Sequence, residues 1–249
     1  MTRFYDPDLA RTLVLNEDES RHAVRVLRLT EGNDIEVVDG KGNLYHCRIS
    51  MAHPKRCAVE VVGSEKVSPH WGQHLTLAVA PTKHLDRTEW MVEKCVELGV
   101  DRIVPLLCRN SERVNLKTER LERVAVAAMK QSLKATLPHI DDLTPLDRLV
   151  ETLPTAGQRF VAYCDAALPR EQRRLLAQCF VPDGSDTTLL IGPEGDFAPD
   201  EVERLLAAGF VPVSLGDSRL RTETAAFTAL AVCHTLIQAH QDHSTHPTI

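Results

Sequence analysis

Two glycine-containing loops in the C-terminal half of the chain carry residues that could bind a ligand. The first follows the apolar run Leu189–Ile191 and contains Gly192 and Gly195. Glycine has no Cβ, so its backbone N–H and C=O groups can lie directly against a ligand. Ligands in open α/β sheets bind outside the carboxyl ends of the strands, which is where this loop falls. Because the loop matches neither the dinucleotide-binding nor the P-loop glycine pattern, a plain strand-to-helix turn is the alternative.

The second loop follows the apolar run Val211–Leu215 and also leaves the strand through a glycine, Gly216. Two arginines and a glutamate come next, among them Arg221 and Glu223. Loops of this kind after successive strands predict a shared ligand pocket. The alternative is a surface ion pair between arginine and glutamate, which contributes little to stability.

The residues before about 70 are predicted to be mostly β-structure with one early helix. Acidic and capping residues start that helix at Asn16–Ser20, and it is predicted to continue to about Leu29. Asp39–Asn43 is a strong hairpin signal between two apolar runs. Short strands joined by tight turns predict a small barrel, with strands at Ile35–Val38, Leu44–Ser50 and Cys57–Val62.

The pattern changes after Ser68–Gly72, which is typical of a linker. Apolar runs then predict strands at Leu75–Ala80, Arg102–Leu107, Phe160–Cys164, Thr188–Ile191 and Val211–Leu215. Helices are predicted between and after them, at Asp86–Leu98, Thr118–Ala135, Pro169–Gln178, Asp200–Ala208 and Thr224–Ala239. This alternation predicts an α/β domain with a parallel sheet covered on both faces. We therefore expect two domains, residues 1–72 and residues 73–249.

Composition excludes several classes of protein. No run of 18 or more apolar residues and no signal peptide is found, so we expect no membrane span. The seven cysteines are scattered and form no C-x-x-C pair, which favours reduced thiols and a cytoplasmic location over disulfides or a zinc site. The net charge of −6 means that any nucleic acid must be bound by a local basic patch.

The two glycine loops, at Ile191–Phe197 and Leu215–Ala225, together resemble the bacterial 16S ribosomal RNA uridine-N3 methyltransferases of the SPOUT superfamily. Weaker matches precede them in the right order, at His22–Arg28, Glu89–Lys94, Glu97–Val100 and Gln131–Ser132. The resemblance implies a small PUA-like β-barrel domain that binds RNA, followed by a SPOUT-type parallel sheet with a C-terminal trefoil knot. It also implies a homodimer, S-adenosyl-L-methionine as cofactor, and 16S ribosomal RNA or the small ribosomal subunit as partner.

The chain departs from the family pattern at several positions. Asp196 stands where the family usually has a second glycine, and Ala198 stands where it has a capping serine or threonine. We therefore expect Asp196 or a nearby carboxylate to cap the next helix, and the loop to be looser than usual. His84–Asp86 replaces a glycine-aspartate pair, and Lys134 lies where an arginine is common.

Basic residues at helical spacing are candidates for contacts with RNA phosphates. Arg21, Arg25 and Arg28 would share one face of the early helix, with Val24 and Leu27 facing the small domain's core. A second stripe, at Arg123, Lys130 and Lys134, follows the same logic. A solvated charged face is the alternative for both sets; given the resemblance, phosphate contact is favoured, with Lys134 among the RNA-binding residues.

The resemblance also suggests roles at the reacting centre, where N3 of uracil must lose a proton. Arg221 is the candidate for stabilising negative charge on the uracil carbonyls. Glu223 is the candidate for accepting the proton or orienting the arginine. No metal is required, and the predicted cofactor-binding residues are Ile191, Gly192, Gly195, Leu215, Gly216 and Leu220. Two alternatives stay open: a SPOUT enzyme acting on transfer RNA, and a non-catalytic RNA-binding or ribosome-assembly protein.

Overall fold

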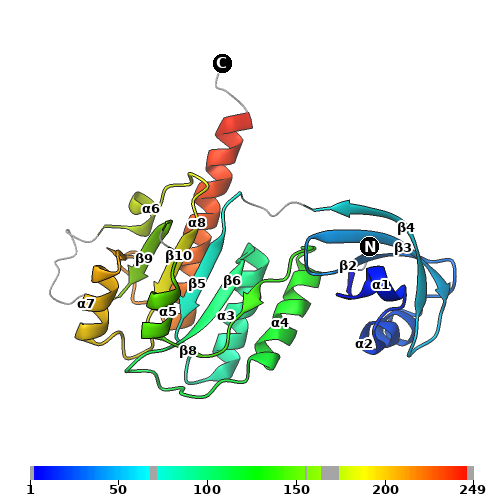
Figure 1. Cartoon of the computed structure of the whole chain (residues 1–249), viewed down its shortest axis with the longest axis horizontal. Coiled ribbons are helices and arrows are strands. Elements are labelled where there is room, and N and C mark those ends of the chain that lie inside the picture. The colour runs from blue at the N-terminus through cyan, green and yellow to red at the C-terminus, as the bar shows by residue number, and fades with distance from the viewer. Residues whose placement is uncertain (1–2, 68–71, 155, 164–173, 246–249) are drawn as a thin grey trace. The chain divides into compact units, whose positions relative to one another are not determined.

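The computed structural model describes residues 3–67, 72–154, 156–163 and 174–245, with side chains described as far as residue 241. Packing divides the chain into two compact units. Unit 1 holds residues 1–70 together with 126–137, and unit 2 holds residues 71–125 and 138–249. Helix α4 (Thr118–Gln131) therefore begins in unit 2 and ends in unit 1. Figure 1 shows both units and labels helices and strands in each of them.

Unit 1 is built on a four-stranded sheet with the order β1-β2-β3-β4. The three predicted strands are present, and their hairpin turn is closed by Asp39, whose carboxylate accepts hydrogen bonds from the backbone N–H groups of Lys41 and Asn43. The first strand was not predicted and pairs parallel to the second. The strands are β1 (Arg3–Tyr5), β2 (Asp34–Val38), β3 (Asn43–Met51) and β4 (Ala58–Lys66), and a short helix α1 (Leu9–Thr12) follows β1.

The early helix ends sooner than the sequence predicts. Helix α2 (Glu17–Arg21) passes directly into a π-helical turn, His22–Val26, and Leu27 caps it. Arg28 then adopts φ +56°, a left-handed conformation that no helix accommodates. The prediction of a helix to Leu29 is therefore wrong. Leu27, which was expected to face the core, is exposed.

Unit 2 contains a seven-stranded sheet with the order β11-β9-β10-β5-β6-β7, in which β8 also pairs with β6. All its pairs are parallel, which confirms the predicted parallel sheet. The five predicted strands are present, and every residue of β5 is buried, as expected for a sheet covered on both faces. The strands are β5 (Leu75–Val79), β6 (Arg102–Leu107), β7 (His139–Ile140), β8 (Thr144–Pro145), β9 (Gln158–Ala162), β10 (Thr187–Ile191) and β11 (Val211–Val213).

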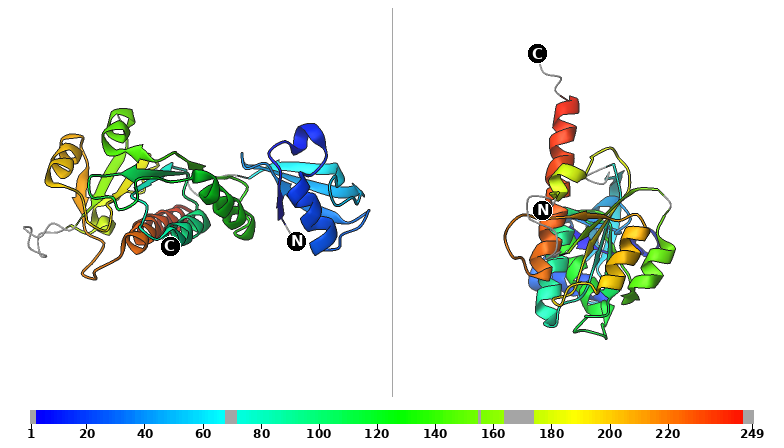
Figure 2. Two further views of the ribbon diagram at one scale, coloured as in Figure 1. Left: turned by 90° about the horizontal axis from the view of Figure 1, so that it is seen from below. Right: turned by 90° about the vertical axis from the view of Figure 1, so that its left-hand side faces the viewer.

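Helices cover both faces of this sheet. Figure 2 shows α3 (Leu85–Leu98) and α8 (Thr222–Thr245) on one face, and α5 (Leu146–Thr152) and α7 (Pro199–Ala207) on the other. An apolar core fills the α5 and α7 side, where Leu149 and Leu205 pack against strand residues such as Val104 and Leu190. No helix among the described ranges is long and apolar enough to cross a membrane.

Some predicted helix ends are shifted. α3 ends at Gly99 as predicted, because that glycine takes φ +90°. α4 stops at Gln131 rather than Ala135, since Leu133 takes φ +55°. The helix predicted at Pro169–Gln178 begins outside the described residues, and the described part is α6 (Leu176–Cys179).

Candidate functional site

The carboxyl ends of the parallel strands in unit 2 share one edge, and the first glycine loop lies there. It leaves β10 after Ile191, next to the chain that leaves the neighbouring strand β5. The two are joined by hydrogen bonds: the Ala80 N–H donates to the Ile191 oxygen over 3.2 Å, and the Lys83 N–H donates to Glu194 Oε1 over 3.0 Å. The loop is thus fixed to the turn that precedes α3.

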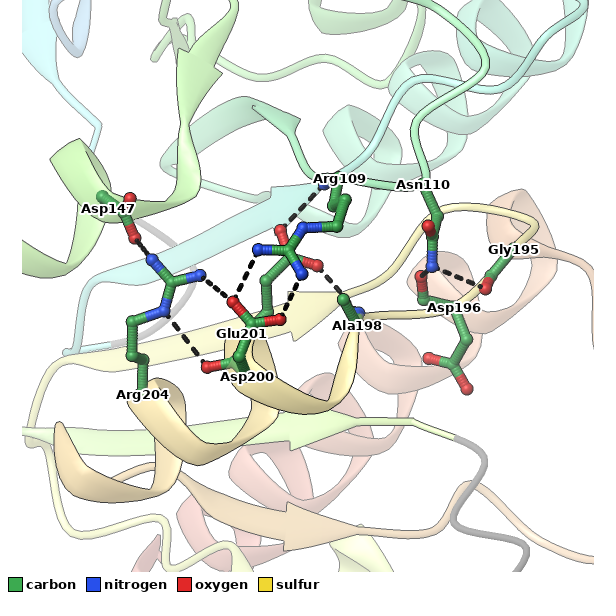
Figure 3. Close-up of polar contacts among 9 residues, drawn as sticks. All are labelled: Arg109, Asn110, Asp147, Gly195, Asp196, Ala198, Asp200, Glu201 and Arg204. Atoms are coloured by element: carbon green, nitrogen blue, oxygen red, sulfur yellow. Dashed lines mark hydrogen bonds and ion pairs between the residues drawn. The ribbon is translucent and has the colours of Figure 1, made fainter.

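A second attachment comes from the residues that follow β6. Asn110 Nδ2 donates to the carbonyl oxygens of Gly195, over 3.3 Å, and of Asp196, over 3.1 Å (Figure 3). Asp196 itself has φ +61°, which explains why a glycine is usual here. Its Oδ1 accepts a hydrogen bond from the Phe197 N–H over 2.8 Å. These bonds hold both the backbone of the loop and its left-handed residue, and a loop looser than is usual in the family stays a prediction.

The helix after this loop is capped by a carboxylate, as predicted. Glu201 is 4% exposed, and its Oε2 accepts a hydrogen bond from the Ala198 N–H over 2.8 Å. Its Oε1 accepts one from the Arg109 N–H, also over 2.8 Å. The Arg109 guanidinium pairs with Asp200 through both of its terminal nitrogens (Figure 3). Glu201 therefore caps α7 from the third helical position, by accepting the Ala198 N–H, and ties the helix to the residues that follow β6.

The three predicted glycines differ in what surrounds them. A Cβ on Gly192 would lie 3.0 Å from the Phe197 ring, and one on Gly195 would lie 3.1 Å from Asn110 Cβ. At these two positions an added side chain would require a neighbouring side chain or the loop to move. Gly216 has φ +112° and nothing within 4 Å of its Cβ position, so its backbone borders open space.

The second glycine loop follows β11 at the same edge. β9 separates β11 from β10, so strands that succeed each other in sequence are not neighbours in the sheet. In this loop Leu215 and Leu220 are half-buried, whereas Gly216 and Arg221 are exposed. Within the described part of the chain, the Arg221 guanidinium forms no ion pair. It is therefore available to a ligand.

Glu223 has a partner that the sequence did not indicate. It lies in the first turn of α8, is 7% exposed, and places Oε1 3.9 Å from Nε of Arg87 on α3. Its Oε2 is buried and accepts no hydrogen bond from any described residue. A surface ion pair with Arg221 is therefore the wrong interpretation. Sequence reasoning missed Arg87 because no local pattern links residues so far apart.

The basic stripes are not the continuous faces that helical spacing predicted. Arg28 lies beyond the helix, and Arg21 pairs with Asp18 over 2.5 Å, which leaves Arg25 exposed without a described ion pair. Lys130 contacts the buried Glu19 and lies 5.9 Å from the centroid of a phenylalanine ring, so it packs within unit 1. Lys134 follows the end of α4 and is half-buried.

Comparison with known proteins assigns the unit that carries the glycine loops to a protein family. A family model described as an RNA methyltransferase domain matches residues 69–234. The chain belongs to this RNA methyltransferase family. A second model, described as an RNA methyltransferase PUA domain, matches residues 15–62 and assigns the small sheet of unit 1 to that domain type.

Relatives within the family match over almost the whole chain. The chain is 31% identical to the ribosomal RNA small subunit methyltransferase E of Synechocystis sp., over 92% of this chain and 74% of that one. The Bacillus subtilis protein of the same name is 28% identical over 89% of each chain.

Solved structures of the family have the same fold. A probable rRNA-methyltransferase from Porphyromonas gingivalis has a TM-score of 0.91 and 45% identity, over 96% of this chain and all of that one. A ribosomal RNA small subunit methyltransferase E from Neisseria gonorrhoeae, solved bound to S-adenosyl methionine, has a TM-score of 0.80 and 25% identity, over 95% of this chain and 98% of that one.

Proposed function

We propose that this chain transfers a methyl group from S-adenosyl-L-methionine to N3 of a uridine in 16S ribosomal RNA of the small subunit. The observation that carries the proposal is the pair of glycine loops at the carboxyl edge of a parallel sheet, in a chain whose RNA methyltransferase match spans both loops. Relatives named for small-subunit ribosomal RNA support the choice of substrate.

The residues at this edge suit the cofactor. Gly216 presents backbone to open space, where a Cβ would otherwise project. Leu215 and Leu220 are half-buried beside it and offer apolar surface. Together with Ile191, Gly192 and Gly195 on the first loop, they form the cofactor-binding set in this proposal. Support comes also from the relatives whose structures were solved with S-adenosyl methionine.

The chemistry needs a charge stabiliser and a proton acceptor. The cofactor, when bound, supplies an activated methyl group. Arg221 is exposed and unpaired within the described ranges, so its guanidinium is free to stabilise the anion that forms as N3 loses its proton. Glu223 keeps one buried oxygen without a hydrogen-bond donor, which suits a group that accepts a proton. Arg87, 3.9 Å from the other oxygen, would hold that carboxylate in place.

The same proposal includes the architecture expected of the family. Residues 1–72 act as a PUA-like β-barrel domain that binds RNA, with Arg21, Arg25, Arg28 and Lys134 as contacts. Residues 73–249 act as the methyltransferase domain, with a C-terminal trefoil knot, in a cytoplasmic homodimer. The PUA match to residues 15–62 supports the first of these assignments.

The test is to titrate the purified protein with S-adenosyl-L-methionine by calorimetry and then to assay methyl transfer to small ribosomal subunits and to transfer RNA. The proposal predicts heat of binding and transfer to the subunit alone. Transfer to transfer RNA would favour the other enzyme class. Absence of both heat and transfer would leave a non-catalytic RNA-binding or ribosome-assembly protein.

A further inference from the structure

A basic hollow lies within unit 2 where α4 begins. It has a volume of about 700 Å³, within the range of ligand sites. Its charged lining residues are Arg113, Lys117, Glu119, Arg120 and Arg123. We propose that this hollow binds the phosphodiester backbone of the RNA substrate. The inference rests on the proposed function and adds a site of which the sequence predicted only Arg123 as a phosphate contact.

The charge of the hollow sets it apart from the rest of the chain. Four of its lining residues are cations and only Glu119 is acidic, although the chain carries a net charge of −6. A second hollow in unit 2, of about 500 Å³, has Arg102 and Arg148 opposed by Glu122, Asp141 and Asp142. An unbalanced cluster of cations in an acidic protein attracts polyanions.

Two of the cations are held in place by the protein. Arg113 donates from Nε to the Thr82 oxygen over 3.1 Å and from a terminal nitrogen to the Lys83 oxygen over 2.5 Å. Carbonyl oxygens orient this guanidinium without cancelling its charge. Arg120 donates to Glu89 over 3.0 Å, so its charge is partly balanced.

The other two cations of the hollow, Lys117 and Arg123, are free to bind phosphate. Lys117 and Arg123 are exposed and form no ion pair with any residue of the described segments. A guanidinium can bind a phosphate through two parallel N–H donors, and an ammonium adds a point charge. The hollow therefore combines a fixed arginine with two exposed cations that have no ion pair among the described residues, a set suited to successive phosphates of one strand.

The hollow is linked to the first glycine loop through the turn that precedes α3. Lys83 accepts a hydrogen bond from Arg113 through its oxygen and donates one to Glu194 through its N–H, over 3.0 Å. Arg113 and the first glycine loop are thus attached to the same residue. A strand held in the hollow would pass beside the carboxyl edge, where its target base could reach the methyl donor.

The experiment measures the affinity of a small-subunit ribosomal RNA fragment over a series of KCl concentrations. The double variant Lys117→Ala/Arg123→Ala is compared with Arg148→Ala, which removes an exposed arginine from the balanced hollow. Each lost phosphate contact lowers the salt slope by about 0.7 for a single strand and about 0.9 for a duplex. We expect the double variant to lose roughly twice that value, Arg148→Ala to keep the wild-type slope, and both to bind S-adenosyl-L-methionine normally.

A wild-type slope in the double variant, with normal methylation by the wild-type protein, would overturn the assignment of the hollow while leaving the proposed function intact. Failure of the wild-type protein to bind or methylate the RNA would overturn both. Alanine at these positions could disturb the start of α4, so the salt series is repeated with Lys117→Gln/Arg123→Gln. Melting curves for every variant show whether the fold is intact.

Discussion

Asn110 donates a hydrogen bond from its side-chain amide to the backbone oxygen of Asp196, 3.1 Å away, and Asp196 is held in the left-handed region at φ +61°. Asn110 follows β6, and Asp196 lies in the loop after β10. A position that favours glycine is therefore occupied by aspartate and stabilised from a separate loop. The carboxylate adds its own bond, to the Phe197 N–H.

Substitutions at Asp196 should separate backbone strain from hydrogen bonding. Asp196→Ala loses the bond to Phe197 and keeps a Cβ in the left-handed region, so we expect the free energy of unfolding to fall by about 1–3 kcal/mol. Asp196→Gly loses the same bond but relieves the strain, so it should cost less. Urea unfolding of the two variants checks this, and a larger loss for glycine than for alanine would contradict it.

Gly192→Val is expected to weaken cofactor binding and also to destabilise the protein. A side chain here would fill space that the proposed function assigns to the cofactor. In the structure the added Cβ would meet the buried Phe197 ring at 3.0 Å, so the ring or the loop must shift. Calorimetry with S-adenosyl-L-methionine and a melting curve measure the two effects. An unchanged melting temperature would show that the loop yields without cost.

Buried thiols should make the protein lose stability in alkali. Burial raises the pKa of Cys47 to about 11, and that of Cys95, Cys108 and Cys233 to about 12. The folded state therefore keeps these protons after the unfolded chain begins to release them near pH 9. Their contribution is complete below about pH 9 and is lost as the pH rises toward 12.

At pH 10 each such thiol should lower the free energy of unfolding by up to about 1.4 kcal/mol relative to pH 8. Urea unfolding at the two pH values measures the change. Cys95→Ala serves as the control, since it removes one titrating group and should show a smaller difference between pH 8 and pH 10. An equal difference in wild type and variant would mean that Cys95 does not contribute.

Arg221→Ala should slow methyl transfer more than it weakens binding. A cation here interacts weakly with neutral uracil and strongly with the anion formed when N3 loses its proton. We expect the single-turnover rate to fall roughly ten- to a thousandfold, with little change in cofactor or RNA affinity. Lysine should rescue only in part, because it keeps the charge without the planar fork. A variant that dissociates or melts early, yet methylates at the normal rate when intact, would assign Arg221 a structural role.

The sequence predicted the regular parts of the fold well, for physical reasons. Strands buried on both faces, such as β5 and β10, read as continuous apolar runs. The strands β1, β7 and β8, of two or three residues each, were not predicted because so few residues carry little pattern. β11 is as short as β1 but was predicted, because it lies in the longer apolar run Val211–Leu215. Helix ends marked by glycine were predictable at Gly99, whereas those at Arg28 and Leu133 lack that signal.

The candidate site was predictable only where its residues are local. The glycine loops could be read from spacing, and capping of α7 by a carboxylate was predicted without singling out Glu201. The Asn110 bond to the loop and the ion pair of Arg87 with Glu223 join distant segments, and nothing in either segment alone indicates them. The basic stripes are not continuous helical faces, because the π-helical turn and the ion pair of Lys130 with Glu19 depend on packing. Phosphate contact by Arg21, Arg25, Arg28 and Lys134 stays a prediction.

The central claim is tested most directly by mapping methylated uridines in 16S ribosomal RNA from cells with and without the gene, by mass spectrometry of digested RNA. We predict one N3-methyluridine that is present in the parent, absent in the deletion strain, and restored by the wild-type gene but not by the Arg221→Ala form. An identical set of methylated uridines in the parent and the deletion strain would contradict the proposed function.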